Sequence, residues 1–178
     1  MNSHTLVLGG ARSGKSAYAL GLANAYIKKD TESGVSKGLY VATAQALDEE
    51  MRKRIEAHRL ERGDGWETVE EPVEVPAVIR DRSGACPVIL VDCLTLWVSN
   101  LLHASPDILD QKMDGLVHAV SASKAPVILV SNEVGLGLVP DTAIGRRFRD
   151  NAGRLHQALS RVCGSVFFVM AGLPLRLK

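Results

Sequence analysis

At 178 residues, with 46% hydrophobic and 23% charged side chains, the chain has the length and balance of a globular domain with a sizeable core. Its net charge of +1 gives no reason to expect a nucleic-acid partner, and no apolar run approaches the length of a membrane-spanning helix. The first residues are polar and the apolar run behind them is short, so we expect no signal peptide. Three scattered cysteines without a CxxC pair argue against a disulfide framework or a zinc site, which favours a cytoplasmic protein.

In chain order, short β-rich runs alternate with segments that have a helical pattern. Strands are predicted at 5–10, 38–44, 66–71, 87–94, 126–134 and 165–172, and the alternating PLRLK at 174–178 predicts a hairpin partner for the last of them. Helices are predicted at 15–29, 46–62, 73–82, 94–103, 107–123 and 142–161. Most of the strand runs are continuously apolar, as in parallel strands buried on both faces. The alternation predicts a three-layer α/β domain with helices on both faces of the sheet.

The segment GGARSGKS at 9–16 lies between the first predicted strand and the first predicted helix, and it fits the P-loop pattern G-x-x-x-x-G-K-S. Its glycines allow backbone N–H groups to surround phosphate oxygens, and the positive end of the helix dipole adds to the attraction. We expect Lys15 to reach the β- and γ-phosphates and the Ser16 hydroxyl to ligate Mg²⁺. The alternative is a glycine-rich turn that matches by chance, but the strand–loop–helix context favours binding of a nucleoside triphosphate.

Two further strands end in polar residues. Asp92 ends the run VILVD and is a candidate for the second metal-linked carboxylate of a P-loop site. The alternative is that Asp92 only caps the helix that follows it. Asn132 and Glu133 end another strand, and they are plausible cleft residues because open α/β sheets bind ligands at the carboxyl ends of their strands.

The predicted helix at 46–62 carries a histidine in an unusual setting. At about 100° per residue, His58 continues an apolar stripe into the charged end of the helix, and Arg62 follows on the same face. The stripe consists of Leu47, Met51 and Ile55. One interpretation is a partly buried histidine satisfied by a neighbour; the other is a nucleophile or acid–base group among phosphate-binding arginines. The histidines without a comparable setting are His4, His103, His118 and His156.

Six segments, in order along nearly the whole chain, resemble the bifunctional adenosylcobinamide kinase/adenosylcobinamide-phosphate guanylyltransferases of cobalamin biosynthesis. These segments are GGARSGKS (9–16), YVATA (40–44), RIEAHRLERGDGWETVEE (54–71), VDCLTLWVSNLL (91–102), VSNEVGLGLVP (130–140) and FRDNAGRLHQ (148–157). The P-loop alone is widespread, whereas the longer segments are specific. We therefore expect a single P-loop nucleotide-binding transferase domain spanning 1–178. Its expected fold is three-layer α/β and RecA-like, with a mostly parallel sheet and one antiparallel C-terminal edge strand.

The resemblance implies two reactions. The aminopropanol hydroxyl of adenosylcobinamide is phosphorylated from a nucleoside triphosphate, ATP or GTP. GMP is then transferred from GTP to adenosylcobinamide phosphate through a guanylyl-histidine intermediate, which gives adenosylcobinamide-GDP and pyrophosphate. The resemblance also implies Mg²⁺ as a cofactor and a homo-oligomer, in particular a homotrimer.

Carried over residue by residue, the resemblance makes His58 the catalytic histidine. The candidate metal ligands, Ser16 and Asp92, come from the P-loop pattern described above. The nucleotide-binding residues that it implies are Gly9, Gly10, Ala11, Arg12, Ser13, Gly14, Lys15, Ser16, Ala42, Thr43, Ala44, Arg59, Leu60, Glu61, Arg62, Glu70 and Asp92.

Two other functions remain open at this stage. A different P-loop small-molecule kinase would transfer phosphate without forming a covalent nucleotide adduct. A RecA-type ATP-binding module would act as a motor or regulator, although the near-neutral charge argues against it.

Overall fold

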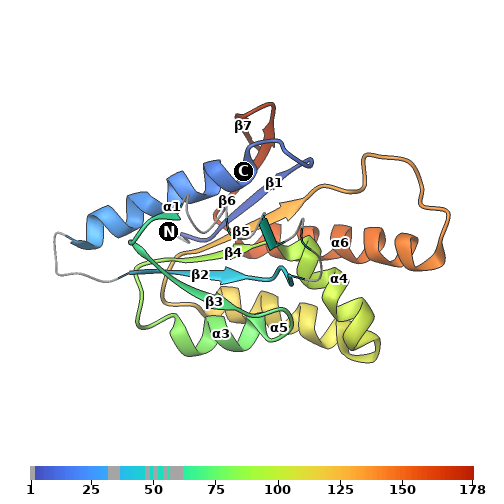
Figure 1. Ribbon diagram of the computed structural model, residues 1–178, viewed down its shortest axis with the longest axis horizontal. Coiled ribbons are helices and arrows are strands. Elements are labelled where there is room, and N and C mark those ends of the chain that lie inside the picture. Colours follow the sequence, from blue (N-terminus) through green and yellow to red (C-terminus); the bar gives the residue numbers. More distant parts are fainter. Residues whose placement is uncertain (1–2, 32–36, 47–48, 50–51, 54–55, 57–61) are drawn as a thin grey trace.

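The computed structural model describes residues 3–31, 37–46, 49, 52–53, 56 and 62–178. The strands of this described part form one seven-stranded sheet in the order β3-β2-β4-β5-β1-β6-β7 (Figure 1). They are β1 (Thr5–Gly9), β2 (Gly38–Ala42), β3 (Trp66–Glu70), β4 (Ile89–Asp92), β5 (Val127–Asn132), β6 (Ser165–Met170) and β7 (Leu173–Arg176). All neighbours pair in parallel except β6 and β7, which are antiparallel. The predicted sheet is therefore confirmed.

Helices cover both faces of the sheet, as Figure 1 shows, with α1 on one face and the other helices on the opposite face. They are α1 (Lys15–Thr31), α3 (Val75–Arg82), α4 (Leu94–Ala104), α5 (Leu109–Ala122) and α6 (Ala143–Val162). Successive side chains of a strand point to opposite faces, so each central strand contributes to two cores. In β1, Leu6 and Leu8 belong to the core beneath α3 to α6, whereas Val7 belongs to the core beneath α1. Burial on both faces explains why these strands are continuously apolar.

Two helices begin two residues later than the sequence pattern predicts, each for a local reason. The helix predicted from residue 73 begins at Val75, because Oε1 of Glu71 accepts hydrogen bonds from the N–H groups of Val73 and Glu74. The helix predicted from residue 107 begins at Leu109, since Pro106–Ile108 form a separate 3₁₀ turn. Of the helix predicted at 46–62, only 46, 49, 52–53, 56 and 62 are described, and all of these except residue 46 are helical.

The carboxyl ends of the parallel strands align at one edge of the sheet. Ala42 at the end of β2 pairs in register with both Glu70 on β3 and Asp92 on β4. Gly9 at the end of β1 pairs with Asn132 on β5. The same edge therefore holds the start of the glycine-rich loop and the polar residues that end the neighbouring strands. No helix in the described part of the chain is long and apolar enough to cross a membrane.

Candidate functional site

The glycine-rich loop connects Gly9, the last residue of β1, to Lys15, the first residue of α1. A Cβ atom at position 9 would lie 2.4 Å from the carbonyl oxygen of Val169, so only glycine fits beside β6. Gly14 has a φ of +91°, a conformation that side chains with a Cβ rarely adopt. The two glycines that define the motif are therefore each required by the backbone path of the loop.

The turn between β6 and β7 supports this loop from the side. Ala171 and Gly172 have positive φ values of 51° and 79°, and the N–H of Gly172 donates a 2.8 Å hydrogen bond to the carbonyl oxygen of Ser13. A Cβ at Gly14 would lie 3.1 Å from Cα of Gly172, so the turn and the loop are in close contact. The conformation of the loop thus depends on the antiparallel hairpin.

Lys15 folds back over the loop that precedes it. Its side chain is buried, and Nζ donates a hydrogen bond to the carbonyl oxygen of Gly10 at 3.0 Å. The hydroxyl oxygen of Ser13 is buried without a hydrogen-bond partner among the described residues. The loop therefore provides the positive charge of Lys15, the hydroxyl group of Ser13 and backbone N–H groups. These are the groups that a phosphate site requires.

Asp92, at the end of β4, is held by Tyr40, which itself packs against a cationic side chain. Tyr40 Oη donates a hydrogen bond of 3.1 Å to Oδ2 of Asp92, and the Arg62 guanidinium carbon lies 3.8 Å from the centre of the Tyr40 ring. Burial raises the pKa of Tyr40, and the negative charge of Asp92 raises it further, so the phenol stays protonated and donates. Trp66 packs edge-on against the same ring, with 6.2 Å between ring centroids.

A cavity of about 410 Å³ opens between α1 and these residues. Ser16 and Asp92 both line it, together with Asn24, Tyr40 and Arg62. One hydroxyl and one carboxylate form a donor set that suits Mg²⁺, which commonly takes few protein ligands and completes its octahedron with water and phosphate oxygens. No group of three or more His, Cys, Asp or Glu residues that could hold a metal occurs in the described ranges, so a denser protein cage is not present there.

The structure excludes one of the two interpretations of Asp92, that it caps the following helix. The N-cap residue of α4 is Cys93, and the helix begins at Leu94. The interpretation of Asp92 as the helix N-cap is therefore wrong, because Asp92 still belongs to β4 and faces the cavity.

The other residues expected to bind nucleotide lie at the same edge of the sheet but in different environments. Thr43 is fully buried, and its Oγ1 both donates to the carbonyl oxygen and accepts from the N–H of Cys93, at 2.8 Å each. Ala44 is half-buried and Glu70 is exposed. The backbone of Thr43 is engaged as well, since its N–H donates to the carbonyl oxygen of Asp92 and its carbonyl oxygen accepts from Asn100 Nδ2, so Thr43 supports the edge of the sheet from inside.

His58, Arg59, Leu60 and Glu61 lie outside the described residues, so their predicted roles stay predictions. Arg62 is the one residue of that motif which the structure places, at the wall of the cavity beside Asp92.

A polar group beside the loop was missed in the sequence. His156 on α6 is buried, with Nε2 2.7 Å from Oγ of Ser131 and Nδ1 3.7 Å from Oε2 of Glu133. The sequence singled out His58 and gave no indication of this buried contact between His156, Ser131 and Glu133. Helical spacing was the available signal, since His156 shares the buried face of α6 with Ala152, Leu155 and Leu159.

A phosphate-binding loop follows a buried first strand, and a carboxylate from a strand two places away in the sheet lines the same cavity as Ser16. This arrangement defines a P-loop nucleotide-binding protein of the RecA-like class. The structure of a KaiC-like protein, PH0186 from Pyrococcus horikoshii OT3, has the same fold. The two structures superpose with a TM-score of 0.54 at 14% sequence identity, and the match covers 94% of this chain and 71% of that one. Residues 5–177 match the family described as cobinamide kinase / cobinamide phosphate guanyltransferase, and the chain belongs to this family of enzymes.

Full-length relatives agree with this assignment. The bifunctional adenosylcobalamin biosynthesis protein CobP of Pseudomonas aeruginosa is 47% identical over 174 residues, which cover 97% of this chain and 96% of that protein. The bifunctional adenosylcobalamin biosynthesis protein CobU of Escherichia coli K12 is 36% identical over 187 residues, covering 97% and 98%. The resemblance seen in the sequence is confirmed.

Proposed function

We propose that this protein acts as one P-loop transferase domain that catalyses both reactions on the cobinamide side chain. In the first, the aminopropanol hydroxyl of adenosylcobinamide takes the γ-phosphoryl group of ATP or GTP. In the second, GMP passes from GTP to the resulting phosphate, with release of pyrophosphate. Family membership supports the overall chemistry, and the observation that carries the site is the placement of Lys15, Ser16 and Asp92 around one loop and cavity.

For the phosphoryl transfer, the chain supplies position and positive charge. The loop N–H groups and the Lys15 ammonium would bind the β- and γ-phosphates, after Lys15 releases the carbonyl oxygen of Gly10. Arg62, at the cavity wall, would offset charge on a transferring group. Ser16 and Asp92 would hold Mg²⁺, which neutralises phosphate charge when bound. Tyr40 keeps the carboxylate of Asp92 in place through its hydrogen bond.

For the guanylyl transfer, we propose His58 as the nucleophile. A neutral imidazole is nucleophilic near pH 7, since its ordinary pKa is about 6.5. A bond forms between a ring nitrogen and the α-phosphorus of GTP, while the bond from that phosphorus to the pyrophosphate oxygen breaks. A phosphate oxygen of adenosylcobinamide phosphate then displaces the histidine, and the imidazole becomes neutral again. Arg59 and Arg62 would stabilise the charge that develops on the α-phosphate and pyrophosphate.

Covalent labelling tests the proposal directly. Incubation with α-³²P-GTP and Mg²⁺ is expected to label the protein, and adenosylcobinamide phosphate is expected to discharge the label into product. The label should be lost in acid and comparatively stable in base, as expected for a phosphorus–nitrogen bond. His58→Ala is expected to remain unlabelled, whereas His118→Ala, on the exposed side of α5, serves as the matched control. Equal labelling of the His58→Ala protein would rule out His58 as the nucleophile.

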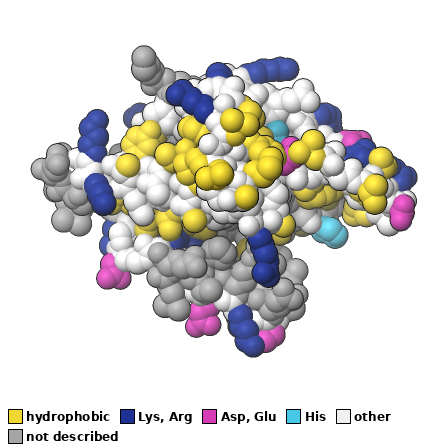
Figure 2. Space-filling model, turned by 90° about the horizontal axis from the view of Figure 1, so that it is seen from above, with side chains coloured by type: hydrophobic (Ala, Val, Ile, Leu, Met, Phe, Trp, Pro, Cys, Tyr) yellow, Lys and Arg dark blue, Asp and Glu magenta, His cyan; other side chains and the backbone are white. Residues whose placement is uncertain are grey.

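We further propose that the protein assembles as a homotrimer. Most of the exposed large apolar side chains among the described residues lie in two parts of the chain, and Figure 2 shows hydrophobic groups gathered on the face of the molecule where β7 lies. Those in the hairpin and directly after it are Met170, Leu173, Leu175 and Leu177, and those in the segment after β5 are Leu136, Leu138 and Val139. Exposed apolar patches of this kind are typical of protein–protein contacts. Light scattering coupled to gel filtration checks the mass, and a monomer at micromolar concentration would contradict the proposal.

A further inference from the structure

Ser131, Glu133 and His156 form a connected polar group at the end of β5. Ser131 and Glu133 are two residues apart, and His156 reaches them from α6 on the sheet face opposite α1. Ser131 is fully buried, so it is out of reach of any substrate and cannot serve as a nucleophile. The accessible member of the group is Glu133, whose side chain is 22% exposed.

The contacts of the histidine determine how it holds the glutamate. Glu133 offers only acceptor oxygens to Nδ1 of His156, and this favours the tautomer in which Nδ1 carries the proton and Nε2 accepts from the Ser131 hydroxyl. Burial lowers the pKa of His156, in keeping with a neutral ring. At 3.7 Å, the separation of Nδ1 and Oε2 is longer than a hydrogen bond, so the carboxylate has room to shift toward a ligand.

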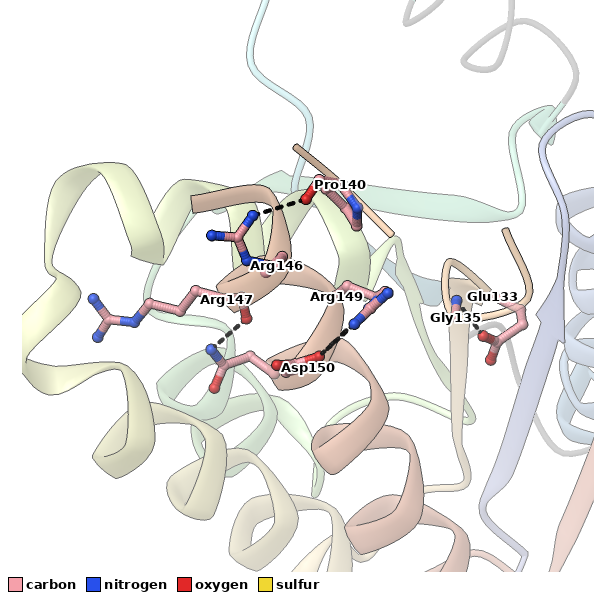
Figure 3. Close-up of polar contacts among 8 residues, drawn as sticks. Glu133, Gly135, Pro140, Arg146, Arg147, Arg149 and Asp150 are labelled. Carbon is pink, nitrogen blue, oxygen red and sulfur yellow. Dashed lines mark hydrogen bonds and ion pairs between the residues drawn. The ribbon is translucent and has the colours of Figure 1, made fainter. Parts of the chain in front are cut away.

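A second contact fixes the other carboxylate oxygen. The N–H of Gly135 donates to Oε1 of Glu133 at 2.6 Å, and Figure 3 shows this short turn at the end of β5. The chain beyond it is tied to the start of α6 by Arg146, whose guanidinium donates to the carbonyl oxygen of Pro140 (Figure 3). The same guanidinium nitrogen also donates to the carbonyl oxygen of Asp141. The turn thus holds Oε1 of Glu133, while Oε2 lies beside His156.

Glu133 also lies directly beside the phosphate-binding loop. Its N–H donates a 3.0 Å hydrogen bond to the carbonyl oxygen of Gly9, the first loop residue. Because β5 lies between β4 and β1 in the sheet, Glu133 follows the strand that separates Asp92 from the loop. Glu133 therefore lies at the carboxyl-end edge of the sheet, where open α/β sheets bind their ligands and where a loop-bound nucleotide would meet its acceptor.

We propose that Glu133 is the general base of the phosphoryl-transfer reaction and that His156 is the positioning residue which aims its carboxylate. This inference rests on the proposed kinase function. As the acceptor hydroxyl oxygen bonds to the γ-phosphorus, the bond from that phosphorus to the bridging oxygen of the nucleoside diphosphate breaks. The hydroxyl proton passes to Glu133 and later to solvent. The guanylyl transfer has no such proton to remove, because its acceptor is already a phosphate oxygen.

Glu133→Gln tests the base, with ATP and adenosylcobinamide as substrates of the full chain. The expected result is a fall in kcat of about 10²–10⁴-fold, in the range of general-base catalysis, with KM for both substrates little changed. Labelling by α-³²P-GTP and its discharge into adenosylcobinamide phosphate are expected to match the parent protein. Glu67→Gln, on edge strand β3 where Glu67 pairs with Arg82, is the matched control and is expected to keep full kinase activity.

Two conservative variants of His156 separate positioning from packing. In His156→Asn, the side-chain amide lies near the former position of Nδ1 and can still donate to Glu133. In His156→Gln, the amide lies near the former position of Nε2 and keeps the contact with Ser131. We expect His156→Gln to lose about tenfold or more in kinase kcat and His156→Asn to lose much less, with guanylyl transfer unaffected in both.

The outcomes distinguish failure of the roles of Glu133 and His156 from failure of the proposed kinase function. If the parent protein forms adenosylcobinamide phosphate and Glu133→Gln forms it equally fast, Glu133 is not the base and only this inference fails. Equal kcat values for the two His156 variants would overturn the positioning role. If the parent protein phosphorylates no adenosylcobinamide at all, the proposed function and this inference fail together.

Discussion

The phenol of Tyr40 donates a hydrogen bond to the carboxylate of Asp92, with 3.1 Å between Oη and Oδ2. The two residues come from neighbouring strands, and both line the cavity beside Ser16. Tyr40 thereby orients the carboxylate that we assign to the metal, and it connects that carboxylate to Arg62 through its ring face.

Tyr40→Phe removes this hydrogen bond and keeps the ring that packs against Arg62 and Trp66. We expect a folded protein in which the Mg²⁺ concentration for half-maximal kinase rate rises about tenfold, as for the loss of other partners that orient metal ligands. A magnesium titration of the initial rate measures this. Tyr26→Phe, on α1 away from Asp92, is the control, and an equal shift in both variants would argue against a specific role of Tyr40.

Asp92→Asn retains the size of the side chain and an oxygen that can accept from Tyr40, but removes the negative charge. Since Mg²⁺ prefers carboxylate ligands, we expect a strongly raised Mg²⁺ requirement with unchanged thermal stability. Rate measurements over a magnesium series, with thermal unfolding beside them, separate the two effects. Loss of stability with normal magnesium dependence would show that Asp92 has a structural role only.

Lys15→Ala removes the ammonium group that now bonds to Gly10 and that we expect to bind phosphates. A lost hydrogen bond to a charged group is worth about 1.5–3 kcal/mol, so affinity for the triphosphate should fall roughly ten- to a hundredfold. Isothermal titration with GTP and Mg²⁺ measures the affinity, and Lys124→Ala, at an exposed position, is the control. Unchanged affinity together with normal turnover would refute the phosphate-loop assignment.

Gly9→Ala and Gly10→Ala form a matched pair within the loop. The added methyl group at position 9 would lie 2.4 Å from the carbonyl oxygen of Val169, whereas at position 10 it meets no atom within 4 Å. We expect Gly9→Ala to lower the free energy of unfolding by about 1–3 kcal/mol and Gly10→Ala to leave it nearly unchanged. Urea denaturation measures both, and equal stabilities would show that β6 does not constrain the loop.

The stability of the protein should depend on pH through His156. Burial lowers its pKa from the ordinary value of 6.5, while Glu133 offsets part of this shift. The unfolded chain therefore binds more protons as pH falls below about 6.5, and the free energy of unfolding decreases. His156→Gln is expected to lose less stability than the parent protein between neutral pH and about pH 5. Parallel curves for the two proteins would contradict a buried neutral His156.

Much of the architecture follows from local features of the sequence. Continuous apolar runs predict the buried parallel strands, and the motif from Gly9 to Ser16 predicts the loop and the start of α1, because burial and backbone geometry act over a few residues. The late start of α3 was not predictable from periodicity, since it depends on the side chain of Glu71.

The parts of the site that the sequence did not predict depend on pairing between distant segments. Tyr40 meets Asp92 only because β2 and β4 are neighbours in the sheet, although β3 lies between them in the sequence. His156 meets Ser131 and Glu133 only because α6 packs next to β5. Helical periodicity indicates that His156 is buried, but it does not indicate which polar groups it contacts.

The hydrogen bond from Gly172 to Ser13 has a consequence for protein synthesis. The phosphate-binding loop is translated near the beginning of this sequence, and the turn that supports it is translated near the end. A nascent chain therefore carries the loop for most of its elongation without the contact that fixes its shape. We expect the loop to reach its nucleotide-binding conformation only after the hairpin has left the ribosome, so that completion of the site follows completion of the sheet.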